Sequence, residues 1–191
     1  REELSVRPDS MVQCRCLIYL TSSFISEGRW EKAREFALEA WVSARRINSK
    51  YQEGIALGNL CIAERGRCRY ASSIDAAMDA IALLDSIGAK LRASHVRRSL
   101  AITQMRKGQL ETALRTAADI LYVASTLSHK VHSRYALLLR ALIHTQAGRM
   151  PEAVSTLEEV VDPAACIKES RPELLRLEYL GDVELEQGNF E

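Results

Sequence analysis

The sequence has little proline and glycine, and its charges nearly cancel. Only 4 Pro and 9 Gly are spread over 191 residues, and 26 Lys and Arg stand against 25 Asp and Glu, which gives a formal net charge of +1. The scarcity of helix-breaking residues among frequent Ala, Leu, Glu and Arg favours helices. The balanced charge excludes a strong overall field that would attract nucleic acid or acidic membranes.

Long apolar runs and catalytic motifs are also absent. No window approaches about 18 uninterrupted apolar residues, and the start Arg1-Glu2-Glu3 has no signal-peptide pattern. We therefore expect a cytoplasmic protein that does not enter a membrane. The sequence has no Gly-rich phosphate loop, no Gly-x-Ser-x-Gly motif and no His-Glu-x-x-His motif, so nothing in it argues for an enzyme. We expect a protein without catalytic activity, cofactor or bound metal.

The cysteines and histidines form no recognisable disulfide or metal pattern. An odd number of cysteines cannot pair fully within one chain, which favours a reducing compartment. Cys14 and Cys16 are two residues apart and therefore point to different sides of a helix. His129 and His132 have a spacing that suits a metal, but no Cys or carboxylate lies near them in the sequence, so we interpret them as solvated side chains. The five cysteines are Cys14, Cys16, Cys61, Cys68 and Cys166.

A period of forty residues runs through the chain. The segment that begins at Gly28 has counterparts that begin at Cys68, Gly108, Gly148 and Gly188. This column suits a left-handed residue that ends one helix, and a large apolar residue two positions later opens the next. Two further columns hold small residues, as expected where antiparallel helices approach closely. They are Ala33, Ser73, Ala113 and Ala153, and Thr21, Cys61, Ala101, Ala141 and Gly181.

We interpret each unit as two amphipathic helices joined by a tight turn, and the chain as an all-α solenoid of antiparallel helix pairs. The first helices are expected at 11–26, 50–66, 90–107, 130–147 and 171–187, and the second helices at 30–47, 70–87, 110–127 and 150–161. A single repeat domain is expected over 1–191, with units at 11–49, 50–89, 90–129, 130–169 and a partial unit at 170–191. We expect it to belong to a larger protein, because the chain begins with Arg1 and stops where another helix should begin.

The segment Leu180-Gly181, followed by Gln187-Gly188 and Phe190, resembles the tetratricopeptide repeat (TPR) consensus of Leu-Gly, a mid-helix aromatic residue, Gly and a second aromatic residue. Typical TPR units have about 34 residues, so these longer units are similar to those of kinesin light chains, Pins/LGN polarity adaptors and bacterial regulators such as the maltose activator. The resemblance implies a right-handed superhelix whose concave face, lined by the first helices, binds ligands. The mid-helix aromatic position holds Phe24, Glu64, Gln104, His144 and Glu184.

The resemblance also implies which side chains line the concave groove. Some TPR domains hold a terminal carboxylate with a clamp of Lys, Asn and Arg, and this chain lacks that clamp. The clamp positions hold Ile18/Ser22, Gly58/Ile62 and Leu138/Leu142. We expect instead apolar patches around a basic centre at Arg98, which suit an amphipathic peptide with acidic residues. The expected groove residues are Tyr19, Ile55, Asn59, Ile62, His95, Arg98, Ile102, Met105, Tyr135, Leu138 and Leu142.

These observations predict a non-catalytic interaction scaffold that binds a peptide or a partner domain. One alternative is the effector-sensing, regulatory region of a bacterial transcription regulator. Another is self-association into a homodimer through the final helix, which is expected to lack a partner helix. Direct nucleic-acid binding by this segment is not expected, because acidic residues balance the arginines near 65–69 and stacking aromatic side chains are missing. The leucines expected to mediate self-association are Leu174, Leu177, Leu180 and Leu185.

Overall fold

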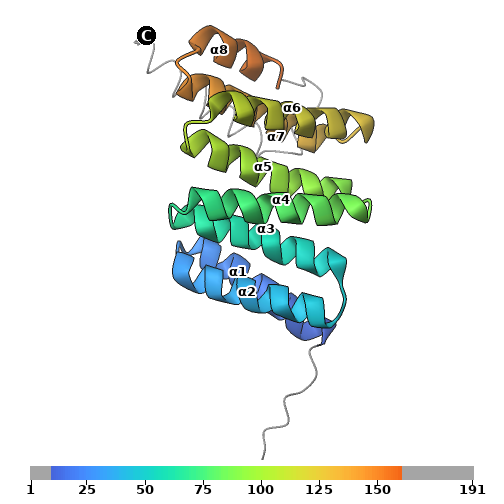
Figure 1. The fold of residues 1–191 in the computed structure, drawn as a ribbon. Helices are drawn as coiled ribbons and strands as arrows, with labels where there is room; N and C mark the ends of the chain where they lie inside the picture. Colours follow the sequence, from blue (N-terminus) through green and yellow to red (C-terminus); the bar gives the residue numbers. More distant parts are fainter. Residues whose placement is uncertain (1–9, 161–191) are drawn as a thin grey trace, which may run out of the picture. The chain divides into compact units, whose positions relative to one another are not determined.

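The computed structural model describes residues 10–160, and these residues form eight α-helices and no strand (Figure 1). The helices are α1 (Met11–Ser26), α2 (Trp30–Arg46), α3 (Lys50–Gly66), α4 (Tyr70–Ser86), α5 (Lys90–Arg106), α6 (Leu110–Thr126), α7 (Lys130–Gln146) and α8 (Met150–Glu158). The predicted all-α class and the predicted helix pairs are confirmed. Helix ends agree with the sequence expectation to one residue, except that α8 ends three residues earlier than predicted. The helix predicted at 171–187, with its expected role in self-association, lies outside the described residues.

The backbone repeats every twenty residues, which is half the period of the sequence. From α3 onward, each described helix begins twenty residues after the one before it. The seven turns between these helices each contain one residue with positive φ, between 51° and 80°. Four are the glycines at 28, 88, 108 and 148, and three are Asn48, Cys68 and Ser128. The left-handed ends of the first helices confirm the predicted turn column, and the second helices end in the same way.

Each turn closes with the same pair of hydrogen bonds. At the first turn, the amide of Arg29 donates to the carbonyl of Phe24 at 2.9 Å, and the amide of Gly28 donates to that of Ile25 at 3.1 Å. This is the Schellman geometry, which satisfies the last carbonyls of a helix with a left-handed residue. Because three residues reverse the chain each time, successive helices lie antiparallel.

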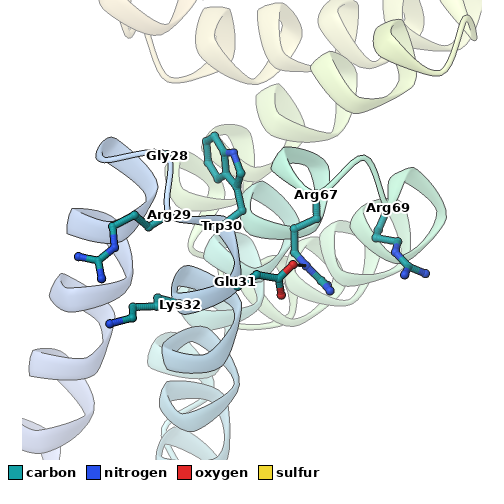
Figure 2. Close-up of a pocket in the computed structure, with 7 residues that line it drawn as sticks. All are labelled: Gly28, Arg29, Trp30, Glu31, Lys32, Arg67 and Arg69. Carbon is teal, nitrogen blue, oxygen red and sulfur yellow. Dashed lines mark hydrogen bonds and ion pairs between the residues drawn. The ribbon is translucent and has the colours of Figure 1, made fainter.

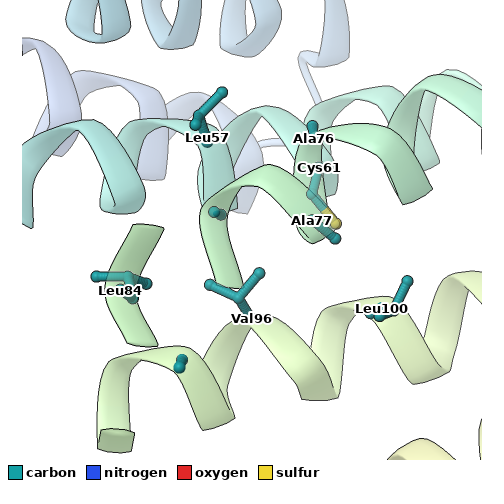
Figure 3. Packing of buried hydrophobic residues seen from close by; sticks show 9 residues of the cluster. Leu57, Cys61, Ala76, Ala77, Leu84, Val96 and Leu100 are labelled. Atoms are coloured by element: carbon teal, nitrogen blue, oxygen red, sulfur yellow. The ribbon is translucent and has the colours of Figure 1, made fainter. Parts of the chain in front are cut away.

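Small side chains bring the helices of each pair together. The residues of the two predicted small columns that lie in the described part of the chain are fully or almost fully buried. In the core that joins α3, α4 and the beginning of α5, alanines lie between larger residues such as Leu84 and Leu100 (Figure 3). An alanine at a helix contact lets the backbones approach closely, so the larger side chains above and below it interlock. The buried members are Leu57, Cys61, Ala76, Ala77, Ala80, Leu84, Ala93, Val96 and Leu100.

The chain divides into two compact units between Thr103 and Gln104, inside α5. In the first unit, α1 packs on α2, α2 on α3 and α3 on α4, and α1 also contacts α3. In the second unit, α6 packs on α7 and α7 on α8. The core of α7 and α8 contains Leu138, Leu157 and Val160.

Candidate ligand-binding surfaces

A small hollow lies between α3 and α5 in the first unit, and it contains five of the predicted groove residues. Its volume is about 190 Å³. The predicted residues in its lining are Ile55, Asn59, Ile62, His95 and Arg98. Gly58, Leu84, Arg92, Val96 and Ser99 complete the lining. We refer to this site as the α3–α5 hollow.

Beneath the α3–α5 hollow, α3 carries a glycine where it meets α5. A Cβ atom built on Gly58 would lie 2.9 Å from Cγ2 of Val96. Real Cβ atoms essentially never make so short a contact, so a larger residue here would require Val96 or its helix to shift. Gly58 therefore lets Val96 pack closely against α3 beneath the hollow. The sequence placed this residue on the inward face but did not indicate how close the helices come.

Polar side chains of α3 connect this helix to α1 and to α5. The Asn59 amide nitrogen donates to the Ile18 carbonyl and to Oγ of Ser22 on α1, each at 3.5 Å. On the opposite side of α3, Nη1 of Arg65 donates to the Ser99 carbonyl at 3.0 Å. This side chain therefore ties α3 to α5.

Basic side chains surround the α3–α5 hollow. Arg92, His95 and Arg98 lie in its lining, and the described lining contains no carboxylate. Nε of Arg92 donates to the hydroxyl of Tyr51 at 2.9 Å, which fixes the direction of this guanidinium. The hollow thus combines apolar walls with positive charge.

The remaining predicted groove residues have different surroundings. Tyr19 on α1 is 64% exposed, and its hydroxyl accepts from Arg15 at 3.4 Å. Ile102 is partly buried in the first unit. In the second unit, Met105 and Leu138 are buried, and Leu138 is part of the core between α7 and α8. Their side chains are closed to a ligand on the surface. Tyr135 and Leu142, also in the second unit, are partly buried.

A second hollow of the first unit combines one indole ring with four basic side chains (Figure 2). It has a volume of about 450 Å³, and we call it the Trp30 hollow. Two turns form it, one between α1 and α2 and one between α3 and α4. The lining residues are Gly28, Arg29, Trp30, Glu31, Lys32, Arg67 and Arg69. The sequence interpretation placed Trp30 and the arginines in separate patterns and did not bring them together.

Packing against the backbone of α3 holds the indole of Trp30 in place. A Cβ atom built on Gly66 would lie 2.2 Å from Cδ2 and 2.4 Å from Cε3 of that ring. The ring therefore occupies the space that a side chain at position 66 would need. This close approach makes the indole a fixed wall of the Trp30 hollow.

A buried carboxylate orients one of the arginines. Nη1 of Arg67 lies 3.0 Å from Oε2 of Glu64, and its Nε donates to Glu31 at 2.7 Å. Glu64 is 8% exposed at its side chain and also accepts from Nε of Arg34 at 2.7 Å. The hydrogen bond to Glu31 raises the pKa of Arg67 above its usual value, so this guanidinium stays charged.

Two members of the mid-helix column of the TPR resemblance contact the second helix of their own pair, with different chemistry. Phe24 stacks on Phe36 with ring centroids 5.1 Å apart. Oε1 of Gln104 accepts from the Thr116 hydroxyl at 2.9 Å. Burial lowers the pKa of His144, which is part of the same column. Phe24 and Gln104 therefore support packing within their pairs, whereas Glu64 bonds to Arg34 on the preceding helix α2.

The described cysteines and the neighbouring His129 and His132 have contacts typical of structural side chains. Cys14 is buried and Cys16 is exposed, which confirms that they point to different sides of α1. Cys61 is buried, and burial raises the pKa of its thiol. The Nδ1 atoms of His129 and His132 lie 3.0 Å apart, where the His129 ring caps α7. Within residues 10–160, no cluster of three metal-ligating side chains forms, and no helix meets the length and hydropathy of a membrane span.

Comparisons with known proteins identify the fold. No family model and no curated protein matches the chain. Two crystal structures of a Podosopora anserina protein, described as a putative kinesin light chain with nearly identical TPR-like repeats, match with TM-scores of 0.72. One of them, a substituted variant, is 17% identical to this chain, and the other is 16% identical. Each match covers 93% of this chain. The matches cover 87% and 88% of the two known chains, respectively. At these identities the similarity concerns the fold, and it confirms the resemblance to a TPR-like helical repeat array.

Proposed function

We propose that the first unit is a non-catalytic protein-interaction scaffold that binds a peptide across α1, α3 and the beginning of α5. The observation that supports this most directly is the α3–α5 hollow, where five of the groove residues implied by the TPR resemblance lie together. Ile55, Ile62 and Val96 supply apolar surface there. Burial of one aliphatic or aromatic side chain in such a site contributes about 1.5–3 kcal/mol.

The size of the hollow favours a side chain over a free metabolite as its occupant. Sites for small molecules usually measure about 300–1,000 Å³, whereas this hollow has about 190 Å³. One anchoring side chain fits the smaller volume, and the rest of the peptide then lies on the surrounding surface. The exposed ring of Tyr19 extends this surface along α1.

The charge around the hollow favours acidic residues next to the anchor. Arg92, His95 and Arg98 lie in the lining, without a carboxylate among the described lining residues. Complementary charge selects partners and accelerates their encounter. The proposed ligand is therefore a peptide with one large apolar residue and acidic neighbours.

A peptide selection followed by charge reversal tests this proposal. Peptides are selected from a random library on the whole chain, and the affinity of the best peptide is measured by fluorescence anisotropy. Arg98→Glu should weaken binding about ten-fold, because an attraction becomes a repulsion. Lys90→Glu is the matched control, since Lys90 is exposed on the same helix and outside the lining. Equal effects of the two variants, or no enrichment of acidic peptides, would contradict the proposal.

A further inference from the structure

We propose that the Trp30 hollow is a second interaction site, which binds an acidic segment of a partner protein. It shares no residue with the α3–α5 hollow. The turns after α1 and α3 and the beginning of α2 form the Trp30 hollow, whereas mainly α3 and α5 form the other. The proposal rests on the charge of its lining, on its fixed aromatic wall and on its size.

The lining has an excess of positive charge. Four of its side chains are basic and one, Glu31, is acidic. Glu31 already forms an ion pair with Arg67. Arg69 is exposed and has no ion pair within the described part of the chain, and Nζ of Lys32 lies 5.8 Å from the centroid of the Phe24 ring. Lys32 and Arg69 therefore offer charge on two sides of the hollow to an anionic ligand.

A third basic side chain can be recruited at little cost. Arg29 pairs with Glu27 at 3.1 Å, and both side chains of this pair are 48% exposed. Exposed ion pairs contribute only about 0–1 kcal/mol, so exchange of Glu27 for a carboxylate of the ligand is nearly neutral. Arg67, by contrast, remains tied to the buried Glu64.

The indole and the volume indicate a peptide segment in place of a small anion. The Trp30 ring is held against Gly66 and belongs to the same lining as the basic side chains. This arrangement suits an apolar residue that adjoins Asp or Glu in a chain. A volume of about 450 Å³ exceeds what one carboxylate or phosphate fills. Glu27, Glu31 and Glu64 near the arginines disfavour the continuous phosphates of a nucleic acid.

Trp30 itself supplies the signal for a binding experiment. The chain has two tryptophans, so Trp41→Phe leaves Trp30 as the single emitter. The probe is a synthetic peptide of alternating Glu and Leu, titrated into the whole chain. We expect a saturable change in Trp30 emission that weakens as salt rises. A peptide with Gln in place of Glu should give no saturable change.

Two double variants with equal changes in net charge separate this site from general attraction. Lys32→Glu with Arg69→Glu should weaken binding of the Glu–Leu peptide about ten-fold. Lys50→Glu with Lys90→Glu changes exposed lysines outside the lining and should alter the affinity less than about two-fold. Circular dichroism verifies folding, and Arg69→Gln provides a milder variant that should weaken binding in the same direction.

Four results would overturn the proposal. The first is an unchanged Trp30 emission on addition of the peptide. The second is an equal loss of affinity in the two double variants. The third is tighter binding of a single-stranded oligonucleotide of matched charge than of the peptide. The variant Arg98→Glu separates the two proposed sites, because a loss through it alone would place the Glu–Leu peptide in the α3–α5 hollow and reject the Trp30 site.

Discussion

The contact between Trp30 and Gly66 predicts that Gly66→Ala lowers the free energy of unfolding when the indole is present and raises it when the indole is removed. Alanine is favoured over glycine within a helix by about 1 kcal/mol, so Gly66→Ala alone would be expected to stabilise α3. In the structure, the added Cβ would lie 2.2 Å and 2.4 Å from two atoms of the indole. Overpacking of this kind costs about 1–3 kcal/mol. Because the overpacking exceeds the propensity gain near a helix end, Gly66→Ala should lower the free energy of unfolding by about 1–2 kcal/mol.

Removal of the ring should reverse this result. In a Trp30→Ala background the space beside position 66 is open, and Gly66→Ala should raise the free energy of unfolding by about 0.5–1 kcal/mol. Urea denaturation followed by circular dichroism gives the four values of the double-mutant cycle. The expected coupling is about 1.5–3 kcal/mol. The same effect of Gly66→Ala in both backgrounds would refute the claim that the indole is held against the α3 backbone.

Three further predictions concern buried ionisable groups. Glu64→Gln should lower the free energy of unfolding by about 1–3 kcal/mol in urea titrations, because it weakens charged hydrogen bonds to a buried acceptor. A thiol reagent should label Cys16 and Cys68 in the folded protein but Cys61 only on unfolding, since burial shields that thiol and raises its pKa. Burial lowers the pKa of His144, so the unfolded chain binds the proton more tightly, and thermal stability should fall as pH drops below about 6.5.

Each of these predictions has a control within the chain. Glu31→Gln removes a carboxylate that is 77% exposed, and it should change the free energy of unfolding by less than about 1 kcal/mol. Labelling of Cys61 at the rate of the exposed thiols would contradict its burial. His144→Gln should reduce the loss of stability in acid; an unchanged pH profile would assign that loss to other groups.

The repeat pattern predicts the helices and turns well, because their positions depend on residues close together in the sequence. Apolar and small residues recur at fixed intervals, so each helix and each turn column could be placed before the structure was known. The expected helix bounds place Asn48 and Ser128 in turns, but they do not predict the left-handed backbone of these residues, since that conformation usually signals glycine. Because their turns match those of the glycine column, the backbone repeats at half the period of the sequence.

The candidate sites were predicted only in part, because a pattern gives the direction of a side chain but not its depth. Leu138 lies on the expected face and is nevertheless buried among residues of α7 and α8. The Trp30 hollow depends on contacts between residues more than thirty positions apart, such as Glu31 and Arg67. The position of Trp30 over Gly66 could not be read from the repeat, which treats each unit separately.

Methyl NMR with the selected acidic peptide tests the central proposal most directly. If the peptide anchors in the α3–α5 hollow, the methyl signals of Ile55, Ile62 and Val96 should shift in proportion to occupancy. The signal of Ile120, which is buried in the second unit, should remain in place. The proposal predicts that Arg98→Glu suppresses these shifts at equal peptide concentration. Unperturbed signals at all three hollow residues in the presence of bound peptide would contradict it.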